Sequence, residues 1–478
     1  MEQKAADPAV VSGAAPPKPR RFVGRRSKKP SGGAEEGESA AGSNSSSAVA
    51  KRGAGRRANP RRLANKIPDD IAQNADLLQA MSALPSNYNF EIPKTLWKLR
   101  QAGARVVALQ FPEGLLMYAC VIADLLQRFG AGVEPLILGD VTYGACCVDD
   151  LAAKALGADF LIHYGHSCLV PISTTSGPPG TTGGGLKMLY VFVEIAIDNA
   201  HLVQCIAATL PPETKLTVMG TIQFATAMFQ AKPLLEAIFP DVHIPQAKPL
   251  SPGEVLGCTS PVLTGRDALV FVADGRFHLE SAMIHNPHLE AYRYDPYGKA
   301  LTRERYDHAQ MHAVRKDAVA AAQGARTYGV ILGTLGRQGN PAILKHVEAL
   351  LHARGKKYFV LLLTEIFPDK LARFGEVDAW IQIACPRLSI DWGYAFAKPL
   401  LSPYEAEVAL KATVWRELYP MDFYAAGSGP WTNYHKPDDA EGGAAAEGGG
   451  GGGGGEEAKG AGAADGSAHV GVAAAAGF

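Results

Sequence analysis

The sequence predicts an α/β fold of three pseudo-repeated domains, each a small parallel sheet flanked by helices. Three apolar segments with the composition of buried strands begin 110 and 112 residues apart, at residues 105–111, 215–220 and 327–333. Each is followed by a turn and then by apolar residues at helical spacing. Strands that alternate with helices in this way are typical of parallel sheets with helices on both faces.

The remaining elements follow in the same order in every repeat. The predicted helices are residues 115–129, 225–239 and 341–353, the second strands are 132–138, 242–245 and 357–363, and the third strands are 158–164, 266–272 and 377–383. An aspartate stands just before the apolar run of every third strand, at Asp159, Asp267 and Asp378. Because this residue recurs almost in register, the period is a property of the whole chain.

Composition separates the two tails from the folded part. Residues 1–66 carry 15 Lys/Arg and 5 Asp/Glu, and residues 434–478 carry 2 and 7, although the formal net charge of the chain is 0. Segments rich in glycine, serine and like charges cannot bury enough apolar surface to fold alone. We therefore expect a disordered basic tail over 1–66, α/β repeats over 67–200, 201–310 and 311–433, and a disordered Gly-rich tail over 434–478.

Hydropathy and cysteine usage bear on the compartment. The sequence has no run of 18 or more apolar residues and no apolar signal-peptide core near Met1. We therefore expect a cytoplasmic protein without a membrane partner, in which the seven cysteines are reduced thiols or metal ligands. The basic N-terminal tail could send a part of the protein to the nucleus. We favour a solubilising arm without specific nucleic-acid binding.

Three of the cysteines share a position relative to the predicted repeats. Cys146, Cys258 and Cys385 lie one per repeat, each at or near the end of an apolar strand-like run and directly after a small residue. Ligands of parallel α/β sheets bind outside the carboxyl ends of the strands. Three thiolates at the centre of three docked domains could hold an iron–sulfur cluster with one iron left open. Spacing alone does not establish such a cluster.

The other four cysteines do not follow the repeat. Cys120 and Cys205 lie in helix-like apolar stretches, where we expect them to pack in the core. Cys147 adjoins Cys146 and could replace it as a ligand, and Cys168 lies near the same strand edge. The sequence contains neither a C-x₃-C-x₂-C loop, which marks conventional radical S-adenosylmethionine enzymes, nor a paired C-x₂-C zinc ribbon.

Six long motifs carry a resemblance to a known family. They are residues 143–150 (YGACCVDD), 256–261 (LGCTSP), 274–281 (DGRFHLES), 292–297 (YRYDPY), 332–339 (LGTLGRQG) and 384–393 (ACPRLSIDWG). They closely resemble the diphthamide biosynthesis protein 1 family, subunit 1 of 2-(3-amino-3-carboxypropyl)histidine synthase. The similarity extends from about Asn65 to Tyr424.

The resemblance implies a [4Fe–4S] cluster held by Cys146, Cys258 and Cys385, with S-adenosylmethionine as the cosubstrate on the fourth iron. The implied chemistry cleaves the bond between the sulfur and the methionine γ-carbon, which gives a 3-amino-3-carboxypropyl radical instead of a 5′-deoxyadenosyl radical. The group would be transferred to one histidine of translation elongation factor 2, the first step of diphthamide biosynthesis. The implied partners are a paralogous subunit 2, in a heterodimer, and a small metal-binding electron donor with its reductase.

Polar residues near the predicted strand ends could hold the cosubstrate or the target imidazole, although none is assigned a catalytic role. These candidates are Gln110, Glu113, His166, Arg276, His278, Arg337 and Arg387. Their alternative roles are helix capping and contacts between domains.

Two other functions stay open. One is a quinolinate-synthase-like cluster enzyme, since that family also has three α/β pseudo-repeats that each supply one cysteine, but acts on small acids. The other is an electron-relay or scaffold subunit of the synthase. An activity that depends on a histidine of a protein substrate would distinguish the diphthamide enzyme from the first of these functions. Full activity after loss of the cluster would support the second.

Overall fold

The structure is a computed structural model that describes residues 66–139, 148–165, 186–336, 338–425, 428–433 and 435. All of these belong to one compact unit of the chain, Asn65–Phe478. Five candidate site residues lie outside the described part: Cys146, Cys147, His166, Cys168 and Arg337. The predicted tails, except for Lys66 and His435, lie outside it too, and the predicted domain boundaries stay predictions. Among the described residues, no helix is long and apolar enough to cross a bilayer.

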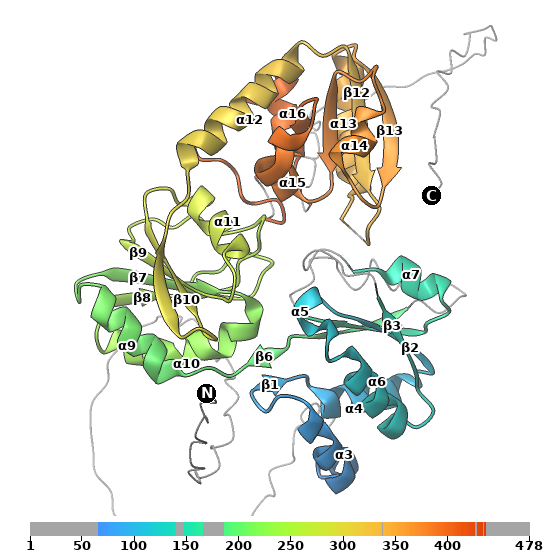
Figure 1. Cartoon of the computed structure of the whole chain (residues 1–478), viewed down its shortest axis with the longest axis vertical. Coiled ribbons are helices and arrows are strands. Elements are labelled where there is room, and N and C mark those ends of the chain that lie inside the picture. Colours follow the sequence, from blue (N-terminus) through green and yellow to red (C-terminus); the bar gives the residue numbers. More distant parts are fainter. Residues whose placement is uncertain are drawn as a thin grey trace, which may run out of the picture. The chain divides into compact units, whose positions relative to one another are not determined.

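Three sheets built mainly from parallel strands form the framework (Figure 1). Their orders are β3-β2-β4-β5, β11-β10-β9-β7-β8 and β13-β12-β14-β15. The strands are β2 (Val106–Gln110), β3 (Glu134–Leu138), β4 (Phe160–Tyr164), β5 (Lys187–Val191), β7 (Lys215–Gly220), β8 (Asp241–His243), β9 (Ala268–Val272), β10 (Glu290–Asp295), β11 (Ala300–Glu304), β12 (Thr327–Gly333), β13 (Lys357–Leu363), β14 (Ala379–Ile383) and β15 (Leu400–Leu401). Among the described strands of these sheets, only the β10-β11 pair is antiparallel. The predicted α/β fold is confirmed.

The three sheets share one topology. In each, the first strand of the repeat lies between the second and the third, and a fourth strand pairs with the third. In parallel sheets with this order, ligands bind where the strand order reverses, outside the carboxyl ends of the first and third strands. These ends are therefore the places where the fold can present functional loops.

The recurring aspartates have the same structural role in every repeat. Asp159 accepts hydrogen bonds from the backbone N–H of Arg105 at 3.0 and 3.2 Å, and Asp267 accepts one from Lys215 at 2.8 Å. Asp378 accepts from the backbone N–H groups that begin the first strand of the third repeat, and these bonds lower its pKa. The aspartate thus ties the start of the third strand to the start of the first, which explains its recurrence without any catalytic role.

Helices cover the sheets and connect their strands. They are α2 (Asp69–Ala72), α3 (Ala75–Ala80), α4 (Ile92–Ala102), α5 (Glu113–Leu116), α6 (Ala119–Phe129), α7 (Asp150–Ala155), α9 (Asn199–Thr209), α10 (Ala225–Glu236), α11 (Phe277–His285), α12 (His308–Gln323), α13 (Pro341–Ala353), α14 (Pro368–Ala372), α15 (Pro386–Trp392) and α16 (Pro403–Ala409), with 3₁₀ turns at Met81–Ala83, Ile222–Phe224 and Gly393–Ala395. A short antiparallel pair, β1 (Tyr88–Asn89) with β6 (Glu194–Ile195), joins the segment before the first sheet to the segment before the second.

The second sheet shows how the layers are built. Figure 1 shows α9 and α10 side by side against this sheet. Along β9, Val270 and Val272 pack in the cluster that includes residues of α9 and α10, whereas Leu269 and Phe271 pack in the cluster that includes residues of α11. Because successive side chains of a strand point to opposite faces, a strand covered on both faces is apolar throughout.

The first predicted helix differs from the structure. Residues 115–129 were expected as one helix, but α5 ends at Leu116 and α6 begins at Ala119. The predicted core position of Cys120 is also wrong, because Cys120 is exposed. The buried face of α6 is formed instead by Ala119, Ile122 and the apolar residues that follow at helical spacing.

Candidate functional site

The loop of the second repeat that carries Cys258 is a tight turn. The backbone N–H of Leu256 donates to the carbonyl of Thr259 at 3.0 Å, and the N–H of Thr259 donates back at 3.2 Å. Gly257 and Cys258 are the two central residues of this turn, and Cys258 is only 7% exposed. A Cβ at position 257 would overlap the ring of Phe277, so the turn requires glycine there.

The chain segment that follows α16, within the predicted third repeat, holds this turn in place. The N–H of Phe423 donates to the carbonyl of Cys258 at 3.3 Å, and the N–H of Tyr424 donates to the Thr259 hydroxyl at 3.1 Å. Ser260 in turn donates its N–H to the carbonyl of Met421 at 2.9 Å. The backbone around Cys258 is therefore fixed by residues that lie more than 160 positions later in the sequence.

Cys385 follows β14, at the carboxyl end of that strand, and is the N-cap residue of α15. Its carbonyl accepts a hydrogen bond from the side-chain amide of Gln382 at 2.9 Å and one from the N–H of Leu388 at 3.0 Å. Gln382 is fully buried and also donates to the Ser389 hydroxyl at 3.0 Å. Since Pro386 begins the helix without an N–H, the entry into α15 is stiff.

Arg387 joins these two cysteine-bearing elements. It lies two residues after Cys385, yet its Nη1 donates to the carbonyl of Gly257 at 3.3 Å and to the carbonyl of Phe277 at 2.7 Å. Its Nε donates to Asp391 at 2.9 Å, and its Nη2 pairs with Glu280. All three guanidinium nitrogens therefore have protein acceptors. Burial opposes the charge of Arg387, but the two carboxylates outweigh it and raise its pKa on balance.

The corresponding edge of the first sheet is built around Gln110. This buried residue ends β2, and its Oε1 lies 3.1 Å from Nδ1 of His163 near the end of β4. The same oxygen accepts the N–H of Asp149 at 3.2 Å, and Asp149 caps α7 through the N–H of Ala152. Gln110 thus anchors the chain three residues after Cys146, which itself lies outside the described residues.

Three other predicted polar candidates are exposed or half-buried. Glu113 is exposed at the start of α5. Arg276 is exposed and pairs with Glu280 at 2.8 Å and with Glu304 at 3.2 Å. His278 is half-buried in α11, with its ring 5.3 Å from that of Phe277. We assign none of these three residues a role in the site.

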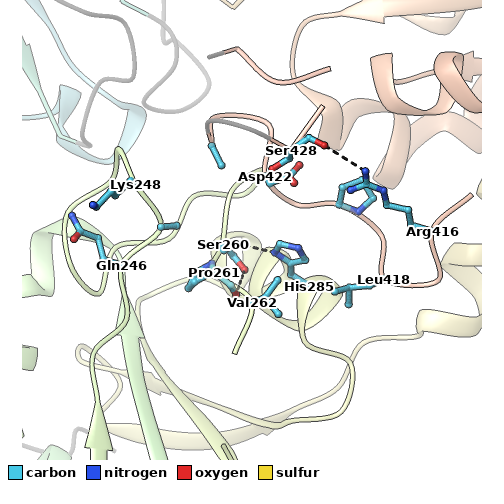
Figure 2. A pocket seen from close by; sticks show the side chains of 13 residues that line it. Gln246, Lys248, Ser260, Pro261, Val262, His285, Arg416, Leu418, Asp422 and Ser428 are labelled. Atoms are coloured by element: carbon cyan, nitrogen blue, oxygen red, sulfur yellow. Dashed lines mark hydrogen bonds between the residues drawn. The ribbon is translucent and has the colours of Figure 1, made fainter. Parts of the chain in front are cut away.

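A pocket of about 670 Å³ lies beside the turn of Cys258 and was not predicted (Figure 2). It is lined by Ser260 directly after this turn, by His285 at the end of α11, and by Arg416 and Asp422 from the C-terminal segment. Nδ1 of His285 lies 2.8 Å from the carbonyl of Ser260. Burial lowers the pKa of His285, although the bond to Ser260 and the charge of Asp422 oppose this effect.

The structure connects the loops that carry two of the three predicted ligands, Cys258 and Cys385. Within the described ranges, no three His, Cys, Asp or Glu side chains form a metal-binding group, and the third cysteine lies outside those ranges. What the described residues do show is a rigid turn and a rigid helix start, each carrying one thiol, joined by one buried arginine. The fold and these loops define an α/β protein of three sheets with the same strand order, with Cys258 and Cys385 on loops between strands and helices.

Comparisons with known proteins assign the family. Residues 111–420 match the family described as "Putative diphthamide synthesis protein". The human 2-(3-amino-3-carboxypropyl)histidine synthase subunit 1 is 57% identical over 81% of this chain and 87% of its own. The protein of that name from Schizosaccharomyces pombe is 49% identical over 86% of this chain and 93% of its own. The chain belongs to this family of diphthamide synthesis proteins, which confirms the resemblance of the six motifs.

A solved structure agrees with this assignment. Dph2 from Pyrococcus horikoshii, in a crystal structure with a 4Fe-4S cluster, has a TM-score of 0.57 and 28% identity to this chain. The match covers 70% of this chain and 93% of that chain. The similarity therefore extends over nearly the whole archaeal protein, whose fold carries such a cluster.

Proposed function

We propose that this chain is subunit 1 of an enzyme that transfers the 3-amino-3-carboxypropyl group of S-adenosylmethionine to a histidine of translation elongation factor 2. This reaction is the first step of diphthamide biosynthesis. The observation that carries the proposal is the identity of 57% over 81% of the chain with a relative named for this synthase activity. Identity at this level, over a shared length that includes both described cysteine loops, supports a common reaction.

We further propose that Cys146, Cys258 and Cys385 hold a [4Fe–4S] cluster. The donor set fits, because thiolates are the usual ligands of such clusters and three of them leave one iron open. The cluster of the archaeal neighbour supports the same cofactor here. When bound, the cluster supplies one electron and an open iron for the amino and carboxylate groups of the cosubstrate.

The residues of the chain would hold and orient these groups. The turn of Leu256–Thr259 leaves no room for a side chain at Gly257, so the backbone next to Cys258 stays packed against the Phe277 ring. Gln382 and Leu388 fix the carbonyl of Cys385 and thereby the direction of its side chain. Cysteines held in this way would keep the cosubstrate in one orientation when the cluster is bound. That orientation would favour cleavage of the bond between sulfur and the γ-carbon over the bond to the 5′-carbon.

We also propose the partners that the family resemblance implies. They are a paralogous subunit 2 in a heterodimer, elongation factor 2 as the protein substrate, and a small metal-binding electron donor with its reductase. The name "subunit 1" of the relatives supports an enzyme of several subunits. We place the protein in the cytoplasm, with a nuclear pool directed by the basic tail.

Product analysis tests this function. The chain is purified without oxygen together with subunit 2, and is supplied with dithionite, S-adenosylmethionine and elongation factor 2. We expect 5′-methylthioadenosine and an elongation factor whose single target histidine has gained a 3-amino-3-carboxypropyl group, both measured by mass spectrometry. An elongation factor with that histidine replaced by glutamine is the control and should gain no mass. Formation of 5′-deoxyadenosine as the main nucleoside, with no mass added to the histidine, would refute the proposal.

A further inference from the structure

We propose that Arg387 is a positioning residue that sets the distance and angle between the loops of Cys258 and Cys385, and that it does not bind the cosubstrate. The inference rests on the proposed function, in which both cysteines bind one cluster. Its first support is the location of Arg387, which is two residues after Cys385 and donates to the carbonyl directly before Cys258. Arg387 therefore links the start of α15 directly to the turn of Cys258.

The guanidinium group is saturated by the protein. Its acceptors are the carbonyls of Gly257 and Phe277 and the carboxylates of Glu280 and Asp391. The side chain is 3% exposed, and the Phe277 ring lies 4.4 Å from its Cζ atom, so the ring covers one face of the guanidinium. A cosubstrate carboxylate would have to displace one of these acceptors in order to bind Arg387. The structure therefore supports a fixed clamp instead of an open anion site.

The clamp needs arginine in particular. Its acceptors lie in several directions around one plane, which a rigid guanidinium fork can satisfy together. A lysine ammonium has a single nitrogen and cannot bridge two backbone carbonyls and two carboxylates at the same time. Lysine at this position would keep the positive charge between Glu280 and Asp391 but would lose the link to Gly257.

The link matters because the two cysteines lie in different predicted repeats. Cys258 and Cys385 are 127 residues apart in the sequence, in the predicted second and third repeats. Residues outside the ligand shell that orient ligands commonly change metal affinity by about 10- to 100-fold when they are replaced. If Arg387 holds both loops in register, its loss should loosen cluster binding even when the fold and all three cysteines are intact.

The test compares Arg387→Lys and Arg387→Met with Arg293→Lys. Arg293 is a matched control in the second repeat, since it also donates to a carbonyl, that of Asp274, and to a carboxylate, that of Glu304. Each variant is purified without oxygen with subunit 2, and iron loss to a chelator, the electron paramagnetic resonance spectrum and the KM for S-adenosylmethionine are measured. We expect about 10-fold faster iron loss and a changed spectrum for Arg387→Lys, a larger effect for Arg387→Met, and wild-type behaviour for Arg293→Lys.

Two results would overturn the inference. One is wild-type iron retention and spectrum in both Arg387 variants. The other is a raised KM for S-adenosylmethionine with unchanged iron retention, which would make Arg387 a cosubstrate-binding residue. If Arg387→Met does not fold, Arg387→Lys and a Glu280→Gln/Asp391→Asn variant, which keeps the arginine but neutralises its anchors, still decide the question. Failure of the proposed function would look different, because Cys258→Ala and Cys385→Ala would then keep their iron.

Discussion

Two buried arginines of this chain have the same ion-pair chemistry and different places in the fold. Arg315 in α12 is 1% exposed, and its guanidinium contacts both carboxylate oxygens of Glu405 at 2.7 Å and the carbonyl of Leu400 at 2.7 Å. Glu405 in α16 also accepts the hydroxyl of Tyr419 at 2.9 Å. These partners of Arg315 all lie within the predicted third repeat, residues 311–433.

Arg387 instead has partners in two repeats, with Gly257, Phe277 and Glu280 in the second and Asp391 in the third. A buried pair inside one repeat stabilises that repeat, whereas a buried cluster of charges between two repeats also determines how their loops meet. The comparison shows that burial and ion pairing alone do not distinguish a positioning arginine from a structural one. The two differ in whether their partners belong to one repeat or to two.

The largest effect that we predict follows from breaking the pair inside the third repeat. Arg315→Met leaves the fully buried carboxylate of Glu405 without its cation, and the loss of one partner of a buried pair costs about 3–5 kcal/mol. Denaturant unfolding should show this loss, while the iron content per folded molecule stays that of the wild type. Arg315→Met/Glu405→Leu is the control and should recover part of the stability. A decrease of less than about 1 kcal/mol in the free energy of unfolding would contradict a stabilising role of Arg315 within its repeat.

A smaller effect is predicted for the contact between Gly257 and Phe277. Gly257→Ala places a methyl group against the Phe277 ring, and such overpacking costs about 1–3 kcal/mol. It should also speed iron loss, because the methyl group pushes the turn of Cys258 away from Arg387. Phe277→Ala in the same background should restore both values in part, as a double-mutant cycle would show. Additive effects of the two changes would show that the contact is absent.

The pocket beside the turn predicts a pH dependence. The pKa of His285 is lowered in the folded state by burial, so the unfolded chain, with a pKa of about 6.5, binds the proton more readily. The contribution of neutral His285 to stability is therefore fully present above about pH 6.5 and is lost as the pH falls below it. Urea midpoints at acidic and neutral pH should show a smaller acid loss for His285→Asn than for the wild type. An equal acid loss in both would contradict this role.

The smallest effect is predicted for the tails. Deletion of residues 1–60 and 438–478 should leave cluster content and transfer activity near wild type in vitro, because neither composition can supply a core. A large loss of cluster would show that a tail belongs to the functional unit. The three-sheet part would then not be sufficient to build the site.

The strands were predictable from the sequence because each is a continuous apolar run. The first strands of the second and third repeats, β7 and β12, begin and end at the predicted residues. The same holds for β13. Strands buried on both faces carry this signal in their own residues, so no knowledge of the tertiary structure is needed.

The rest depends on contacts between distant residues. The role of Arg387 could not be read from the motif at 384–393, because its acceptors lie more than 100 positions earlier in the sequence. The exposure of Cys120 depends on which face of α6 meets the sheet. His285 has no neighbouring motif that would have distinguished it from an ordinary core histidine. The cysteine assignment itself remains a prediction, which comes from the repeat and the family resemblance together.

Iron and sulfide analysis of single cysteine variants tests the central claim most directly. Cys146→Ala, Cys258→Ala and Cys385→Ala, purified without oxygen with subunit 2, should each lose the brown chromophore and the bound iron. Cys120→Ala and Cys205→Ala should keep both, and loss in Cys147→Ala instead of Cys146→Ala would move the first ligand by one residue. Full iron and sulfide in Cys258→Ala and Cys385→Ala would contradict a cluster held by one cysteine from each repeat.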